Sequence, residues 1–181
     1  MVYVFLANGF EETEALVTVD VLRRAGYEVK TVGVGGEYIA GSHNITVKTD
    51  VLEENITPCD ELEAVILPGG MPGTLGLKAS EKVAEFILFA DENKRVIGAI
   101  CAAPFILGRK GILNGKKATC FPGFENELIG AIVLEDGVVS DGNIVTAKGA
   151  GVAWEFGAAI ATLTSGKEKA DSILRGIQWK K

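Results

Sequence analysis

The sequence predicts an α/β fold, a sandwich in which helices cover both faces of a mostly parallel sheet. Two observations lead to this prediction. Strand-like and helix-like segments alternate along the 181 residues, which is typical of parallel strands joined by crossover helices. The strand-like segments are continuous apolar runs more often than alternating ones, as expected for strands that are buried on both faces.

Five short apolar runs, each close to a turn signal, are the predicted strands. They are Val2–Ala7, Glu28–Val34, Ala64–Leu67, Val96–Ile100 and Ile144–Thr146. Two hairpin-like excursions, one around Gly35 and Gly36 and one between Asp136 and Gly142, are expected to add antiparallel strands to the sheet.

Four segments with helical periodicity accompany the strands. The first, Glu12–Ala25, ends at Gly26, as a helix C′ position does. Its apolar face carries Leu16, Val19 and Leu22. The others are Glu81–Asn93, roughly Val152–Leu163, and a C-terminal helix that begins at the capping-box pattern Ser165-Gly166-Lys167-Glu168.

Length and composition fit a single domain over residues 1–181. The net charge of −6 and the pI near 4.9 argue against nucleic acid or an anionic membrane as the main partner. The chain enters a strand-like run without the basic segment of a signal peptide, and its longest apolar stretch is too short to span a bilayer. We therefore expect a cytoplasmic protein with free thiols, and a single histidine makes a zinc site improbable.

Cys101 stands where a strand-like run gives way to a helix-like run that begins at Ala102. A thiol in such a sharp turn would face the N-terminus of the following helix, which lowers the pKa of a cysteine and favours the reactive thiolate. The alternative is a small buried core side chain, because free cysteine is among the most buried residue types.

Three carboxylates crowd the loop after the first strand, those of Glu11, Glu12 and Glu14. They could simply complement the helix dipole. A carboxyl buried near Cys101 would instead have a raised pKa, stay protonated and donate a hydrogen bond to the sulfur. The residues alone do not choose among the three.

Gly69 and Gly70 follow the third strand and form either a plain tight turn or, with the Ala102 N–H, an oxyanion hole beside Cys101. No glycine pattern here matches a phosphate-binding or dinucleotide-binding motif, so no cofactor is expected. His43, the only histidine, is either a solvated surface residue or a partner for Cys101 brought in by folding or by a second subunit. Cys59 and Cys120 are expected to be loop or core thiols.

Several motifs together resemble the ThiJ/PfpI superfamily, and in particular the branch of the parkinsonism-associated protein deglycase and its bacterial relatives. They are Ala99-Ile100-Cys101-Ala102-Ala103-Pro104, Leu67-Pro68-Gly69-Gly70, Gly9-Phe10-Glu11-Glu12-Thr13-Glu14, and Gly149-Ala150-Gly151 followed by Glu155-Phe156. The likeness covers nearly the whole chain in the same order. It implies a flavodoxin-like three-layer sandwich that is usually a homodimer.

The resemblance also implies roles for individual residues. Cys101 matches the oxidisable nucleophile and Glu14 the protonated acid that hydrogen-bonds it, while Gly69, Gly70 and Ala102 match backbone donors around the sulfur. The implied activities are glutathione-independent conversion of methylglyoxal to lactate or removal of early glycation adducts. The alternative is a non-catalytic oxidative-stress sensor or redox-dependent chaperone in which Cys101 oxidises to sulfinate.

Three departures from the family pattern limit what is inherited. Peptidase-like branches have a histidine directly after the cysteine, where this chain has Ala102, so we expect no peptidase activity. Phe121 stands where the deglycase branch often has a histidine. His43 lies where an arginine near the dimer interface is expected. Glu14 would then be the acid–base group for any reaction on a small carbonyl or glycated substrate.

Overall fold

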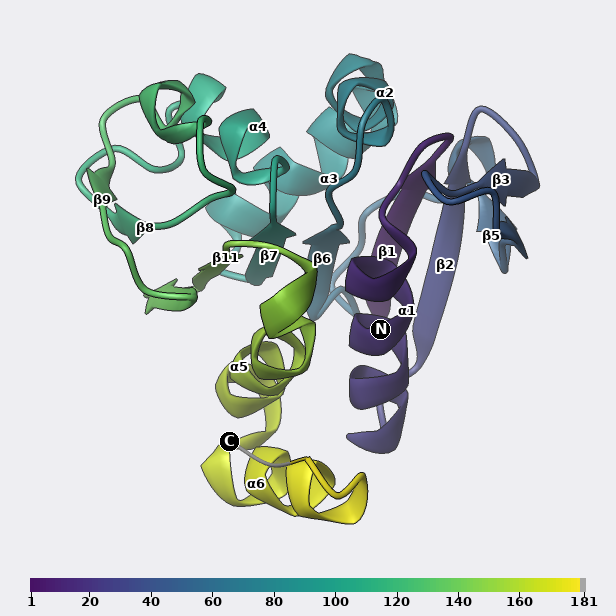
Figure 1. Ribbon diagram of the computed structural model, residues 1–181. Helices are drawn as coiled ribbons and strands as arrows, with labels where there is room; N and C mark the ends of the chain where they lie inside the picture. Colours follow the sequence, from purple (N-terminus) through teal and green to yellow (C-terminus); the bar gives the residue numbers. More distant parts are fainter. Residues whose placement is uncertain (180–181) are drawn as a thin grey trace.

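The computed structural model describes residues 1–179, and its centre is a seven-stranded sheet (Figure 1). The strands are β1 (Val2–Ala7), β2 (Val29–Val34), β5 (Val51–Leu52), β6 (Ala64–Leu67), β7 (Val96–Ile100), β10 (Val138–Asp141) and β11 (Ile144–Ala147). Their order is β10-β11-β7-β6-β1-β2-β5. All neighbours pair in parallel except β10, which pairs antiparallel with β11 at one edge.

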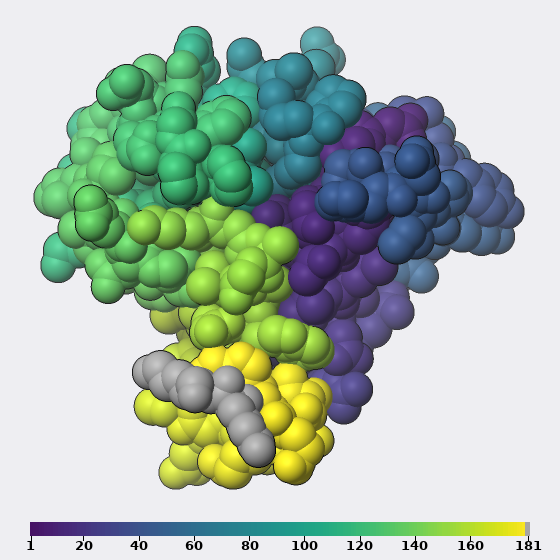
Figure 2. All heavy atoms as spheres, viewed as in Figure 1, coloured from purple at the N-terminus to yellow at the C-terminus, as the bar shows by residue number. Residues whose placement is uncertain are grey.

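Helices cover both faces of this sheet, which confirms the predicted sandwich. The helices are α1 (Glu12–Arg24), α2 (Gly73–Ala79), α3 (Glu81–Glu92), α4 (Pro104–Arg109), α5 (Ala153–Ser165) and α6 (Lys167–Gly176), with 3₁₀ turns η1 (Glu53–Asn55), η2 (Glu125–Glu127) and η3 (Ala150–Val152). One apolar core joins α2, α3 and α4 to the sheet, and a second joins α1, α5 and α6 to its other face. Figure 2 shows α6 at one end of the molecule, packed against α5.

Two short strand pairs lie outside the main sheet. The pair β3 (Tyr38–Ala40) and β4 (Thr46–Lys48) is antiparallel, and the pair β8 (Lys117–Ala118) and β9 (Ile132–Val133) is parallel. The expected antiparallel addition near Asp136–Gly142 is confirmed by β10. The one near Gly35 and Gly36 is wrong in detail, because these glycines only lead from β2 into β3, and β3 and β4 form a sheet of their own.

Two helix predictions need correction, and two short helices were not predicted. Leu16 is 37% exposed, because α1 buries a neighbouring stripe that includes Ala15, Val19 and Leu22. Ser165 is the last residue of α5 and not a cap, while Gly166, with φ +86°, begins α6 without a side-chain hydrogen bond. The short helices α2 and α4 carry too few residues to show a clear periodicity in the sequence.

The carboxyl ends of the central strands meet at one edge of the sheet. Leu67 at the end of β6 pairs with Ala99, and Ala147 at the end of β11 pairs with Ile100. Since β1 runs parallel to them, the loops that follow β1, β6, β7 and β11 converge there, as expected for a site in an open α/β sheet. None of the helices within residues 1–179 has the length and apolar character needed to cross a membrane.

Candidate active site

Cys101 lies in the sharp turn directly after β7, and its backbone has φ +63°. A non-glycine residue in this left-handed region costs on the order of 1–3 kcal/mol and persists only where its surroundings hold it. Two backbone hydrogen bonds do so here. The Cys101 N–H donates to the Ala147 oxygen at 2.8 Å, and the Phe121 N–H donates to the Cys101 oxygen at 2.8 Å. The thiol is half-buried.

Glu14, in the first turn of α1, is the carboxylate that meets this thiol. Its side chain is 1% exposed, and its Oε2 accepts the N–H of Gly69 at 2.8 Å. The carboxyl also hydrogen-bonds the Cys101 thiol and the backbone N–H of Ala150. Of the three acidic residues that the sequence left open, the structure brings Glu14 to Cys101.

Burial raises the pKa of Glu14 to about 7, against the hydrogen bonds from Gly69, Cys101 and Ala150 that favour the carboxylate. Burial and the neighbouring Glu14 carboxylate raise the pKa of the Cys101 thiol to about 12, although the N–H groups of Gly70 and Ala102 favour the thiolate. The prediction of a lowered pKa for Cys101 is therefore wrong when Glu14 is ionised. Helix α4 begins at Pro104 and has six residues, so its dipole is weaker than the sequence implied.

The two groups act as a pair, because each sets the charge that the other can carry. Glu14 loses a proton near pH 7, and the thiol then resists losing a second one beside that carboxylate. At pH 7 about half of the pairs therefore keep both protons, and in the other half Glu14 is ionised and the sulfur holds the remaining proton. This is the arrangement of an acid–base group next to a nucleophile.

The backbone N–H groups of the loop at Gly69 and Gly70 act on different members of the Cys101–Glu14 pair. The N–H groups of Gly70 and Ala102 favour the thiolate form of the sulfur. The N–H of Gly69 instead holds Glu14. A Cβ at Gly69 would lie 2.5 Å from the Cys101 Cβ and 2.6 Å from Glu14 Oε2, so the close approach of these groups requires glycine here.

Glu11 and Glu12 have structural partners of their own. Glu11 is the N-cap of α1, and its Oε2 accepts the Glu14 N–H at 2.6 Å. Glu12 is buried and accepts the backbone N–H of His43 at 2.8 Å and its ring Nδ1–H at 2.9 Å. Burial raises the pKa of Glu12, but the hydrogen bonds from His43 and the Ile45 N–H outweigh this effect and lower it to about 2.

His43 therefore contacts Glu12 and not Cys101, the partner considered from the sequence. Its ring bonds Glu12, and no hydrogen bond or ion pair within residues 1–179 joins it to Cys101 or Glu14. The hydrogen bond to Glu12 raises the pKa of His43. Ligand atoms of Glu11, Glu12 and His43 lie within 4.8 Å of one another, but the hydrogen bonds to Glu12 explain this cluster without an ion.

The remaining thiols lie on other segments of the chain. Cys59 is exposed in the loop before β6, and Cys120 is buried. Burial and the nearby Glu125 raise the pKa of Cys120 to about 11.

Sequence reasoning missed the residues that enclose Glu14 on its Oε1 side. A Cβ at Gly149 would lie 3.7 Å from Glu14 Oε1 and 3.5 Å from Cδ2 of Phe121. The loop after β11 was singled out by its position at the carboxyl edge of the sheet, but nothing in its composition shows that the Ala150 N–H hydrogen-bonds Glu14.

Known proteins resemble this chain in sequence. It is 36% identical to the protein dj-1beta of Drosophila melanogaster over 177 residues, which are 96% of this chain and 94% of that protein. It is 32% identical to a deglycase of Pyrococcus abyssi, covering 81% of this chain and 89% of that one. It is also 32% identical to a glutathione-independent glyoxalase of Caenorhabditis elegans, covering 92% of this chain and 89% of that one. Two relatives from Arabidopsis thaliana are longer, and the chain spans 39% and 44% of them.

Solved structures show the same likeness in three dimensions. The crystal structure of Drosophila melanogaster DJ-1beta matches with a TM-score of 0.92 at 34% identity, over 99% of this chain and 98% of that one. The structure of oxidized Toxoplasma gondii DJ-1 matches with a TM-score of 0.92 at 32% identity over the same shares. The DJ-1/PfpI family model matches residues 1–163. With the resemblance seen in its motifs thus confirmed, the chain belongs to the DJ-1/PfpI family.

Proposed function

We propose that the protein is a cysteine-dependent, cofactor-independent enzyme acting on small reactive carbonyls, with Cys101 as the nucleophile and Glu14 as the acid–base group. The hydrogen-bonded pair of a half-buried thiol and a buried carboxyl with a pKa of about 7 carries this proposal. A general acid or base is most effective when its pKa lies near the working pH. The N–H groups of Gly70 and Ala102 stabilise negative charge on the sulfur as the thiol is deprotonated.

The reaction on methylglyoxal balances without a cofactor. The Cys101 sulfur adds to the aldehyde carbon, a C–S bond forms, and the carbonyl oxygen takes the thiol proton through Glu14 to give a hemithioacetal. Glu14 then removes the proton from that carbon and returns it to the neighbouring ketone carbon, while the hydroxyl proton of the hemithioacetal passes to the ketone oxygen, giving a thioester of lactate. Water cleaves the C–S bond, which releases lactate and restores the thiol. One carbon of the substrate is oxidised and its neighbour is reduced, so no external redox partner is needed.

Two relatives support this class of substrate by their names. One is called a deglycase and the other a glutathione-independent glyoxalase. A glycated side chain enters the same scheme, because an early adduct of a 2-oxoaldehyde with an amine, guanidine or thiol carries a carbon to which the Cys101 sulfur can add.

The decisive test is lactate production from methylglyoxal without glutathione. Wild-type protein should form lactate, and both Cys101→Ser and Glu14→Gln should lose about 10²-fold or more of that rate. Cys59→Ser is the matched control, since this exposed thiol precedes β6 whereas the site follows the carboxyl end of that strand, and it should retain full activity. Turnover that survives in Cys101→Ser would reject the nucleophile, and wild-type turnover no faster than buffer would reject the enzyme.

A redox sensor is the second candidate, because a related structure is described as oxidized and the Cys101 thiol is accessible beside a proton donor. Two molecules of peroxide would each transfer one oxygen to the sulfur and leave as water, giving a sulfinic acid. Intact mass should then rise by about 32 Da, the mass of two oxygens, in wild type and not in Cys101→Ser. Under the sensor function Glu14→Gln changes the extent of oxidation, whereas under the enzyme function it abolishes turnover.

We further propose that the protein acts as a homodimer, as the family resemblance implies. The His43 side chain is 71% exposed and is available to contact a second protomer. Sedimentation velocity should give about twice the 19.1 kDa of one chain, and a monomer at all concentrations would reject the proposal.

A further inference from the structure

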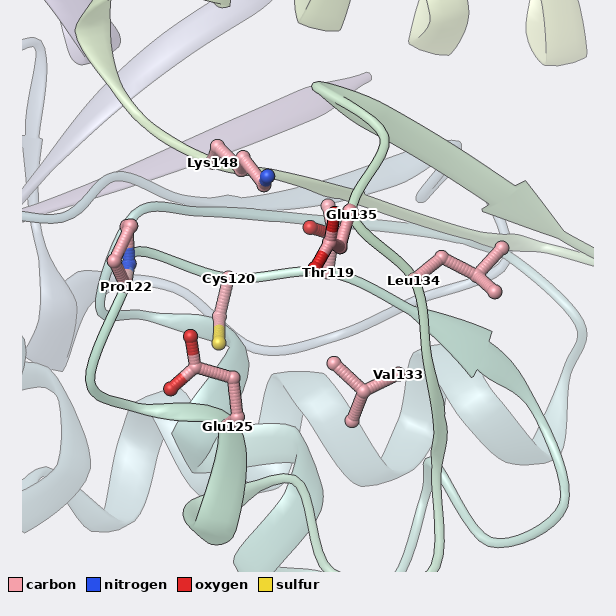
Figure 3. A pocket seen from close by; sticks show the side chains of 8 residues that line it. All are labelled: Thr119, Cys120, Pro122, Glu125, Val133, Leu134, Glu135 and Lys148. Carbon is pink, nitrogen blue, oxygen red and sulfur yellow. The ribbon is translucent and has the colours of Figure 1, made fainter.

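A cavity of about 450 Å³ lies beside the candidate active site and takes no part in the reaction above. It is formed by the segment after β8 with Thr119 and Cys120, by Glu125 of η2, by Glu135 after β9, and by Lys148 after β11. In Figure 3 the sulfur of Cys120 points toward the carboxylate of Glu125, and Lys148 and Glu135 approach from the other side.

The charged groups around this cavity do not neutralise one another. Lys148, Glu125 and Glu135 all line it, yet within residues 1–179 none of the three takes part in an ion pair with another side chain. One cation and two anions that stay apart around an opening suit a ligand that itself carries both signs of charge.

Thr119 supplies a second, independent sign of a ligand. The residue is 1% exposed, and its hydroxyl is buried without a hydrogen-bond partner. Buried hydroxyls are almost always hydrogen-bonded, and an unpaired one costs about 1–3 kcal/mol. Since Thr119 lines the cavity, a polar ligand there would complete its hydrogen bonding.

A neighbouring cavity leads from this one toward the Cys101–Glu14 pair. Pro122 and Lys148 also line a neighbouring cavity of about 380 Å³, which continues along Phe121 and Gly149. These two residues adjoin the pair directly, because Phe121 donates to the Cys101 oxygen at 2.8 Å and a Cβ at Gly149 would lie 3.7 Å from Glu14 Oε1. A ligand that fills both cavities would extend from the charged pocket to the reactive pair.

We propose that this pocket binds the α-ammonium and α-carboxylate groups of a free amino acid whose modified side chain reaches Cys101 through the neighbouring cavity. Glu135 and Glu125 hold the ammonium group, Lys148 holds the carboxylate, and the Thr119 hydroxyl completes the hydrogen bonding. The inference rests on the proposed carbonyl function and narrows its substrates to glycated amino acids with a free head group.

The test uses binding, so that it does not depend on turnover. The Cys101→Ser protein is titrated by calorimetry with Nε-carboxyethyl-L-lysine, which has no reactive carbonyl, and with the same compound capped by an N-acetyl group and a C-terminal methylamide. The free compound should bind at least about tenfold more tightly than the capped one. Lys148→Met and Glu135→Gln, each added to Cys101→Ser, should each weaken the binding of the free compound by about tenfold.

Lys30→Met is the matched control, because Lys30 is half-buried like Lys148 but lies on β2 beside Glu28, and it should leave the dissociation constant unchanged. Equal binding of the free and capped compounds, no binding of either, or an unchanged constant in both Lys148→Met and Glu135→Gln would overturn the proposal. Circular dichroism confirms that each variant is folded. Selective binding in a protein that forms no lactate would support the pocket while rejecting the proposed reaction.

Discussion

Two glutamates in the first turn of α1 are both buried, yet their pKa values are shifted in opposite directions. Glu12 is 5% exposed and its pKa is about 2, whereas Glu14 is 1% exposed and its pKa is about 7. The difference lies in what surrounds each carboxylate. Glu12 receives N–H groups from the turn of the β3–β4 hairpin and from the His43 ring. Glu14 lies deeper in the protein and faces the Cys101 thiol, so burial outweighs the hydrogen bonds that it accepts.

The comparison shows that burial alone does not make a carboxyl an acid–base group. Glu12, with a pKa of about 2, is ionised at neutral pH, and it joins α1 to the turn between β3 and β4. Glu14 is poised between its two charge states at neutral pH. A structural and a chemical carboxylate thus differ through their depth and their donors, although they lie two residues apart on one helix.

The largest effect should come from two glycine-to-alanine changes that disturb one glutamate each. A Cβ at Gly69 would lie 2.6 Å from Glu14 Oε2, and a Cβ at Gly41 would lie 2.2 Å from Glu12 Oε1. Gly69→Ala should lower lactate formation by about 10²-fold or more, because it displaces both members of the reactive pair. Gly41→Ala should destabilise the protein but leave the rate per folded molecule within a few-fold. Equal losses of rate in both variants would contradict the division of roles.

The second largest effect should be a difference between the two carboxylates in how stability depends on pH. Below pH 4.5, the pKa of Glu14 in the unfolded chain, this residue is protonated in both the folded and the unfolded protein. As the pH rises above 4.5, the unfolded chain loses the proton before the folded one does. Its ionisation should therefore reduce the free energy of unfolding as pH rises from 4.5 to about 7, by up to about 3 kcal/mol. Glu12 acts in the opposite sense, since the stability it supplies above 4.5 is lost as pH falls toward 2. Urea denaturation of wild type and Glu14→Gln from pH 4 to 8 should give a difference that grows through this window, and a constant difference would refute the raised pKa.

The neutral isosteres should change stability in opposite directions at pH 8. Glu12→Gln removes charge-assisted hydrogen bonds from His43 and should cost about 1–3 kcal/mol. Glu14→Gln removes a carboxylate that burial disfavours and should be neutral or stabilising. The two midpoints of urea denaturation, measured side by side, check the signs. A larger loss in Glu14→Gln than in Glu12→Gln would invert the comparison.

The smallest effect should follow replacement of His43 by Gln. The His43 side chain is 71% exposed, so solvent replaces its ring hydrogen bond while its backbone N–H still reaches Glu12. Stability at pH 8 and the lactate rate should both stay within experimental error of wild type. A loss of rate comparable with that of Glu14→Gln would bring His43 into the reaction.

The fold was largely predictable because each central strand is an apolar run bounded by turn residues. The bounds of β1, β6 and β7 agree with the predicted segments, since strands buried on both faces leave little choice of residue. Placement of the excursion at β3 and β4 was not predictable, because it depends on the buried contact between Glu12 and the turn near His43, which lie far apart in the sequence.

The candidate site was predictable in part. The position of Cys101 after a strand is local information, and so is the glycine pair that approaches it. The choice of Glu14 came from resemblance to a family, because which of three nearby acids points inward depends on the rotation of α1 and on Gly69 from another loop. The raised pKa of Cys101 was missed because it depends on the burial of the thiol and on the charge of Glu14, which the sequence places 87 residues away.

The backbone carbonyl of Cys101 accepts a hydrogen bond from the segment that begins at Thr119, and this bond holds the turn in place. The Phe121 amide can exchange its hydrogen for deuterium only when it leaves the Cys101 oxygen. The lifetime of the reactive turn is therefore recorded at an amide that belongs to another residue, 20 positions further along the chain. An exchange experiment can follow that lifetime in protein with a free, alkylated or oxidised thiol, without any probe attached to Cys101.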